Sequence, residues 1–211
     1  LKKCQKAEPP KIGHFRGGLL SSIFSKNHSK CPQMAVENHQ KLGAFKVRGG
    51  VNLLAQMEPR DLKKGVSTAS SGNHGQSIAY AANIFGARAF IAVPEIANPG
   101  KVESMRNLGA EVIHYGEHFG IADQYMRDLS KEKGYKYINA VEETQLYAGV
   151  GTYTLEIIED LPDVDIIIVP VGGGSGGATG IRDSVGGRLM RGCGTGAVGS
   201  RRGGKCAYDM Q

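Results

Sequence analysis

The residue whose surroundings most clearly suggest chemistry is Lys46, in the stretch GAFKVRGG at residues 43–50. Hydrophobic periodicity predicts a helix that begins near Phe45. The helix dipole disfavours a charged lysine at that end of a helix, and burial would lower its pKa further. A neutral lysine amine is what Schiff-base chemistry requires. The same stretch could also be an exposed helix start, so its interpretation depends on two other segments.

The first of these segments is SSGNHGQ at residues 70–76, between an expected strand at 65–69 and an expected helix at 73–85. It offers two hydroxyls, backbone amides and the side chains of Asn73 and His74, which could hold a carboxylate and a phenolic oxygen together. By itself the segment is better explained as a helix start whose small residues allow close packing. His74 is consistent with a structural histidine and is assigned no catalytic role.

The second segment is VGGGSGG at residues 171–177, where an expected strand at 165–171 leads into an expected helix at 175–185. Backbone amides of such a turn can converge on a phosphate. A tight turn without a ligand is an equally reasonable interpretation for one glycine run. The segment lacks the Gly-Lys-Ser/Thr of a nucleotide P-loop and the acidic residue of a dinucleotide fingerprint. A phosphate cradle, a polar clamp and a neutral lysine together indicate a pyridoxal-phosphate site.

The sequence predicts alternating strands and helices, and this alternation would place the three segments at the ends of strands. Strands of nearly continuous apolar character, each followed by a helix, predict a parallel sheet covered on both faces, with ligands beyond the carboxyl ends of the strands. Strands are expected at 34–37, 65–69, 88–93, 110–114, 137–139 and 165–171. Helices are expected at 45–57 (ended by Glu58-Pro59), 73–85, 100–108, 121–133, 145–161 and 175–185.

Composition excludes several classes of protein. With 40% apolar and 22% charged residues, the 211-residue chain resembles a soluble globular protein, and no stretch has the ~20 apolar residues that span a bilayer. The four cysteines lack metal-site spacing and are interpreted as free thiols. The formal charge of +6 lies in the two flanks, and residues 34–185 are net acidic. This distribution, with few aromatics among the flanking charges, disfavours a nucleic-acid-binding protein.

The segments AFKVRGG (44–50), SSGNHGQ (70–76) and VPVGGGSG (169–176) resemble, in order and spacing, those of the serine/threonine dehydratase and serine racemase family of pyridoxal-phosphate enzymes. The similarity runs from about Met34 to Ser184. It implies the α/β, tryptophan-synthase-β-like fold (fold type II), with parallel or mixed sheets and helices on both faces. The fold is expected to be incomplete at the C-terminus, because the family pattern stops there.

The resemblance also implies roles for individual residues. Lys46 would carry pyridoxal 5′-phosphate and take the substrate α-proton, Phe45 would pack near the ring, and Asn73 would bond the ring 3′-oxygen. In racemases of the family the second serine of the loop, here Ser71, is the base on the opposite face. The substrate carboxylate would be held by Ser70, Ser71, Gly72, Asn73 and His74. The phosphate would be held by Gly172, Gly173, Gly174, Ser175 and Gly176. No metal ligands are assigned.

Domain boundaries follow from the same resemblance. Residues 34–64 and 143–185 would be parts of a large cofactor-binding domain, and residues 65–142 a small α/β domain. Residues 1–33 read as a poorly ordered or atypical segment, without the family's opening strand. The Gly/Arg-rich residues 186–211 form a tail outside the family pattern, and its part up to Gly204 is expected to be disordered or not native in sequence. Without an initial methionine, the chain is expected to be a fragment.

The activity implied is that of an ammonia-lyase, a dehydratase that converts L-threonine or L-serine to a 2-oxoacid and ammonia by α,β-elimination. Two alternatives stay open: an amino-acid racemase of the serine racemase type, and a catalytically inactive remnant lacking the family's C-terminal third. The expected partner is a small amino-acid substrate, with no nucleic acid and no membrane. A homodimer or higher homo-oligomer is expected if the chain is complete, in the cytoplasm. The loop around Tyr115 to Gly120 is expected to help select the substrate's β-substituent.

Overall fold

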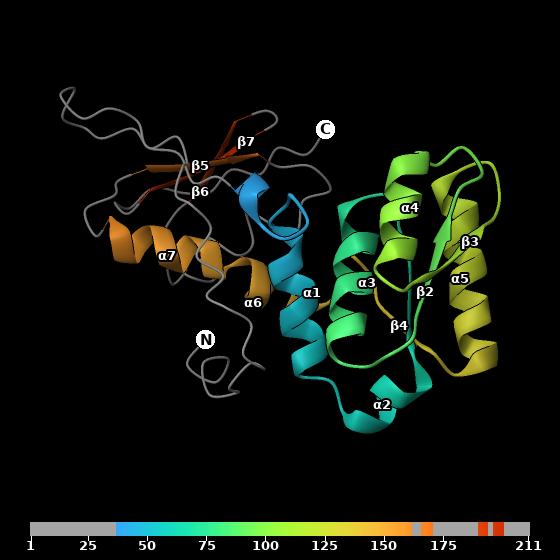
Figure 1. Cartoon of the computed structure of the whole chain (residues 1–211). Helices are drawn as coiled ribbons and strands as arrows, with labels where there is room; N and C mark the ends of the chain where they lie inside the picture. The colour runs from blue at the N-terminus through green and yellow to red at the C-terminus, as the bar shows by residue number, and fades with distance from the viewer. Residues whose placement is uncertain (1–36, 162–165, 171–189, 194–195, 201–211) are drawn as a thin grey trace. The chain divides into compact units, whose positions relative to one another are not determined.

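The computed structural model describes residues 37–161, 166–170, 190–193 and 196–200 (Figure 1). The chain divides into two compact units, one formed by Lys46–Leu146 and the other by Leu1–Phe45 with Tyr147–Gln211. The first unit contains the whole predicted small domain, 65–142, together with two further helices. The assignment of residues 34–64 to a large domain stays a prediction. Within the described residues, no helix is long and apolar enough to cross a membrane.

A four-stranded parallel sheet forms the centre of the Lys46–Leu146 unit, in the order β3-β2-β1-β4. The chain builds the sheet outward from β1 to β3 and then returns to place β4 on the other side of β1. In open parallel sheets, ligands bind at the carboxyl edge where the strand order reverses, here between β1 and β4. The strands are β1 (Val66–Ala69), β2 (Ala89–Val93), β3 (Glu111–His114) and β4 (Lys136–Tyr137).

Helices cover both faces of this sheet, as predicted (Figure 1). On one face of β2, Phe90 and Ala92 pack with Met126 of α5 in a buried cluster. On the other face, Ile91 lies beside the start of α3 and Met105 of α4. The helices of this unit are α1 (Lys46–Ala55), α2 (Pro59–Lys64), α3 (Asn73–Ile84), α4 (Pro99–Asn107) and α5 (Phe119–Lys133).

Helix α1 packs closely against α3 because Gly50 has no side chain. A Cβ added to Gly50 would lie 2.7 Å from the carbonyl oxygen of Ser77. The Gly50 amide donates to Ser77 Oγ at 3.2 Å, so the contact is polar as well as close. The glycine therefore sets the distance between the helix that begins at Lys46 and the helix that follows the 70–76 loop.

We expect Gly50→Ala to lower the free energy of unfolding by about 1 to 2 kcal/mol. The added methyl group meets backbone, which costs about 1 to 3 kcal/mol, and only part of this is offset by the better helix propensity of alanine. Urea denaturation measures the change. Gly100→Ala is the matched control, because a Cβ there approaches no atom closer than 3.4 Å. Equal stability of the two variants would contradict the proposed packing role.

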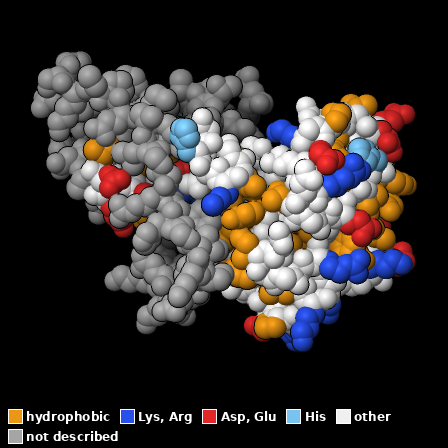
Figure 2. Space-filling model, viewed as in Figure 1, with side chains coloured by type: hydrophobic (Ala, Val, Ile, Leu, Met, Phe, Trp, Pro, Cys, Tyr) orange, Lys and Arg blue, Asp and Glu red, His pale blue; other side chains and the backbone are white. Residues whose placement is uncertain are grey.

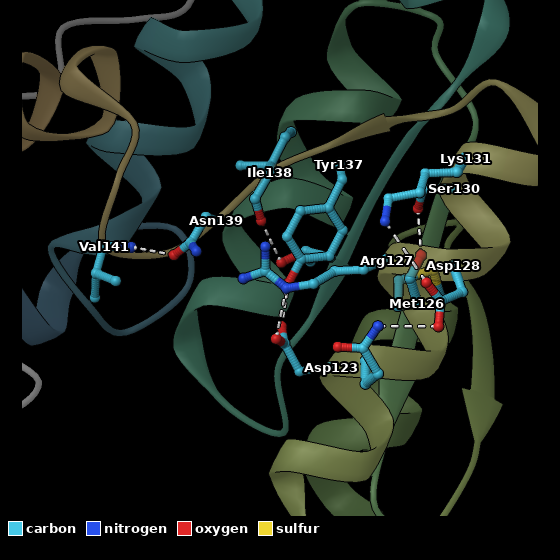
Figure 3. Close-up of polar contacts among 12 residues, drawn as sticks. Asp123, Met126, Arg127, Asp128, Ser130, Lys131, Tyr137, Ile138, Asn139 and Val141 are labelled. Atoms are coloured by element: carbon cyan, nitrogen blue, oxygen red, sulfur yellow. Dashed lines mark hydrogen bonds and ion pairs between the residues drawn. The ribbon is translucent and has the colours of Figure 1, made fainter.

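A polar cluster holds the edge strand β4 against α5 (Figure 3). The Tyr137 hydroxyl donates to Asp123 Oδ1, and Arg127 Nε donates to Asp123 Oδ2 at 2.7 Å. The Arg127 guanidinium lies 4.6 Å from the centroid of the Tyr137 ring. Burial, followed by the hydrogen bond to Asp123, raises the pKa of Tyr137. The tyrosine therefore stays protonated and keeps β4 against α5.

Two predictions about helices were wrong. Pro59 was expected to close the first helix, but that helix ends at Ala55 and Pro59 begins α2, where a missing N–H and a fixed φ fit the first turn. The single helix expected at 145–161 is two helices, α6 (Thr144–Val150) and α7 (Thr152–Asp160). Gly151 separates them, and Thr152 Oγ1 donates to the Gly149 carbonyl at 2.7 Å.

Two further differences lie in the other unit. A short strand was expected at 34–37, and this prediction is wrong for Glu37, which begins a 3₁₀ helix, η1 (Glu37–His39). Residues 34–36 lie outside the described residues. The tail was expected to be disordered or not native in sequence, but two parts of it form strands, β6 (Met190–Cys193) and β7 (Gly196–Ser200), so disorder is wrong for these residues. They pair antiparallel in the order β5-β7-β6 with β5 (Ile166–Pro170), because backbone hydrogen bonds need no apolar side chains. The helix expected at 175–185 lies outside the described residues.

Candidate functional site

Lys46 is the first residue of α1, and its side chain is half-buried. Burial lowers its pKa from the usual value of 10.5. Its carbonyl oxygen accepts a hydrogen bond of 2.5 Å from Ser77 Oγ, the same atom that accepts from the Gly50 amide. Ser77 of α3 therefore fixes the first turn of α1. Hydrogen bonds thus hold the backbone at Lys46 in place, and burial of the side chain favours the neutral amine.

The 70–76 loop leaves the carboxyl end of β1 and leads into α3. Ser70 is buried, its amide donates to the Ala92 carbonyl at 3.0 Å, and its Oγ accepts from the Gly72 amide at 3.2 Å. Ser71 and Asn73 are exposed. Among the described residues no side chain caps the start of α3 at Gly72. Uncapped first-turn amides at a helix N-terminus are suited to an anion such as a carboxylate.

His74 is buried below this loop and is held in one orientation. Its Nε2 lies 3.1 Å from Thr68 Oγ1, and that hydroxyl donates to the Ile138 carbonyl at 2.8 Å. Since the hydroxyl has only one hydrogen, it must accept from Nε2–H of the histidine. Burial, and secondarily the positive charge of Lys46, lowers the pKa of His74 from 6.5 to about 4. A neutral, fully enclosed His74 agrees with a structural side chain.

A further side chain at the loop, Lys101, was not identified from the sequence. It lies in the first turn of α4, and its Nζ donates to Asn73 Oδ1 at 3.3 Å. A lysine at residue 101 has no recognisable spacing to the loop, because the two meet only through the packing of α4 against α3. The structure thus brings Lys46, the 70–76 loop and Lys101 into one unit of the fold.

The remaining predicted site residues belong to the other unit or lie outside the described residues. Phe45 is half-buried and belongs to the other unit, where its ring centroid lies 6.3 Å from that of Tyr153. The predicted phosphate-binding residues, Gly172, Gly173, Gly174, Ser175 and Gly176, lie outside the described residues. The individual roles assigned to Lys46, Ser71, Asn73 and the others stay predictions.

Charge on the described surface is mixed. On the face shown in Figure 2, Lys and Arg side chains alternate with Asp and Glu side chains over the Lys46–Leu146 unit. Several of them form ion pairs, such as Arg88 with Glu111 at 3.7 Å. A surface of this kind suits a small-molecule site better than a polyanion-binding face.

Comparisons with known proteins identify the family of the chain. Residues 30–191 match the family model described as pyridoxal-phosphate dependent enzyme. The chain is 42% identical over 163 residues to an L-threonine ammonia-lyase of Thermotoga maritima, covering 77% of this chain and 41% of the relative. It is 40% identical over 186 residues to an L-threonine ammonia-lyase of Geobacter sulfurreducens, covering 87% and 44%. The chain therefore spans less than half the length of these relatives.

Solved structures show the same similarity. Maize serine racemase matches with a TM-score of 0.67 at 28% identity, covering 78% of this chain and 50% of that one. The processed form of threonine deaminase isoform 2 from Solanum lycopersicum matches with a TM-score of 0.60 at 34% identity, covering 62% and 36%. The fold class predicted from the motifs is confirmed.

Proposed function

This chain belongs to the family of pyridoxal-phosphate dependent enzymes, and from that premise we propose that it is part of an L-threonine or L-serine ammonia-lyase. The resemblance drawn from the motifs and the cofactor expected from it are confirmed for the family. The observation that carries the proposal is Lys46, a half-buried lysine with a lowered pKa in the same unit as the uncapped start of α3. The relatives named L-threonine ammonia-lyase support the substrate class.

The residues described fit pyridoxal phosphate. Lys46 offers an amine whose neutral form is favoured by burial, as covalent attachment requires. Asn73, at the start of α3, offers a side-chain amide that can donate to a phenolic oxygen. When bound, the cofactor supplies an electron sink for the charge left at the substrate α-carbon.

The chain's own residues then have separate tasks. Lys46 Nζ binds the cofactor and, as a neutral amine, accepts the proton from the substrate α-carbon. The first-turn amides of α3 bind and orient the substrate carboxylate, and the positive end of the helix dipole adds to this attraction. The α-proton and the β-hydroxyl together make up the water that is lost, and hydrolysis of the resulting enamine with a second water yields the 2-oxoacid and ammonia. Gly172 to Gly176 are proposed to hold the phosphate.

The function is tested by mixing the purified chain with pyridoxal phosphate and L-threonine. We expect the absorption band of lysine-bound cofactor and the formation of 2-oxobutanoate, measured with a coupled dehydrogenase assay. A band without product would support the inactive remnant instead of the lyase. Absence of the band would contradict cofactor binding by this chain.

Racemisation is a second candidate, supported by the exposed Ser71 and by the structural similarity to maize serine racemase. A hydroxyl on the loop, on the opposite side of the substrate from Lys46, could return a proton to the α-carbon. Chiral chromatography after incubation with L-serine distinguishes the two reactions. D-serine that is lost in Ser71→Ala would support the racemase, and pyruvate alone would support the lyase.

The binding partner and the cellular location of the protein are also proposals. The amino-acid substrate is the partner that the family relationship supports. A homo-oligomer and a cytoplasmic location remain predictions, and size-exclusion chromatography with light scattering would test the first of them.

A further inference from the structure

Few groups near Lys101, among the described residues, stabilise its positive charge. Its Nζ lies 3.3 Å from Asn73 Oδ1, and a Cβ added to Gly72 would lie 3.8 Å from the same nitrogen. The ammonium is therefore beside the loop at the start of α3. Within the part of the chain that the structure describes, Lys101 forms no ion pair with a carboxylate.

Helix geometry makes this position more unusual for a cation. Lys101 is in the first turn of α4 and contacts the first residue of α3, and neither first turn contains an acidic residue. Helix N-termini disfavour positive charge. The placement is nevertheless specified locally: Pro99 begins α4, and Asn98 Oδ1 accepts from the Lys101 amide at 3.2 Å. Pro99 and Asn98 thus fix the backbone of this turn, and the exposed side chain of Lys101 extends from it to Asn73.

The contact determines which way the Asn73 amide points. A lysine ammonium has three donors and no acceptor, so it can pair only with Oδ1 of the asparagine. A flipped amide would place the Nδ2 hydrogens against the ammonium, which is unfavourable. Oδ1 is therefore held at Lys101, and Nδ2, the donor end, is turned away from it.

We propose that Lys101 is a positioning residue that orients the side-chain amide of Asn73, so that Nδ2 donates to the ring 3′-oxygen of pyridoxal phosphate. The inference rests on the proposed function, in which Asn73 binds that oxygen. A donor is the group this oxygen needs, because it carries negative charge when the cofactor is bound. Without Lys101 the amide can flip, and the flipped form presents an acceptor to an acceptor.

The test compares Lys101→Met with Lys101→Arg in the full chain. Titration of the cofactor absorption band measures the dissociation constant for pyridoxal phosphate. We expect Lys101→Met to bind pyridoxal phosphate about five- to tenfold more weakly, because the favourable orientation of the Asn73 amide is lost. Lys101→Arg should bind it within about twofold of the parent chain. Arg106→Met is the matched control, because it removes a cation from the exposed end of the same helix and should leave binding unchanged.

A second readout needs no cofactor. The side-chain amide of Asn73 gives a pair of signals in the ¹H–¹⁵N spectrum, assigned by their loss in Asn73→Asp. These signals should shift in Lys101→Met and stay in place in Arg106→Met. Unchanged signals and unchanged cofactor binding in Lys101→Met would overturn this inference alone. A parent chain that binds no pyridoxal phosphate would overturn the proposed function and this inference with it.

Discussion

Lys46→Ala should abolish the absorption band of bound pyridoxal phosphate and reduce formation of 2-oxobutanoate from L-threonine by at least about a thousandfold. Two tasks are lost together, covalent attachment and proton transfer, and proton transfer alone is commonly worth about a hundred- to ten-thousandfold. The fold should survive, because the side chain is only half-buried and its lowered pKa shows that burial opposes its charge. Circular dichroism and urea denaturation check that the variant remains folded.

The control for this experiment is Lys131→Ala. Lys131 lies on α5, across the sheet from α3, and its side chain is 80% exposed in an ion pair with Asp128. Removing it deletes the same charge without touching the proposed site. If Lys46→Ala retained the band, or if Lys131→Ala lost it, Lys46 would not be the lysine that binds the cofactor.

The placement of the 70–76 loop between a strand and a helix was accessible from the sequence. The short strand at 66–69, the small residues after it and the periodic helices around them predict a parallel sheet, and such sheets bind ligands at strand carboxyl ends. The close approach of α1 to α3 depends on Gly50 and Ser77. A glycine in a helix indicates that another segment packs closely against the helix, but the sequence does not show which segment. The contact between α1 and α3 therefore could not be predicted.

Other features depend on long-range packing or on weak local signals. The meeting of Lys101 with Asn73 joins residues 28 positions apart, and no spacing rule connects them. The break at Gly151 between α6 and α7 was missed because a single glycine is often tolerated inside a helix. The strands at 190–193 and 196–200 have a composition typical of disorder, yet β7 pairs with β5 and β6 pairs with β7.

His74 should make the folded chain less stable as the pH falls from about 6.5 to about 4. Its pKa is lowered from 6.5 to about 4 in the folded chain, so between these values the unfolded chain binds the additional proton. Stability therefore rises with pH across this window. The full effect is about 3 kcal/mol, of which about 2 kcal/mol should be lost between pH 7.5 and pH 5. The side chain is buried, so solvent screening reduces this little.

Urea denaturation of the parent chain and of His74→Gln at pH 7.5 and pH 5 measures this contribution. Glutamine can still donate to Thr68 Oγ1 but does not titrate, so the variant should lose about 2 kcal/mol less than the parent on acidification. His118→Gln, at an exposed histidine, should keep the dependence of the parent. Identical pH dependence in the parent and in His74→Gln would mean that His74 is not held neutral.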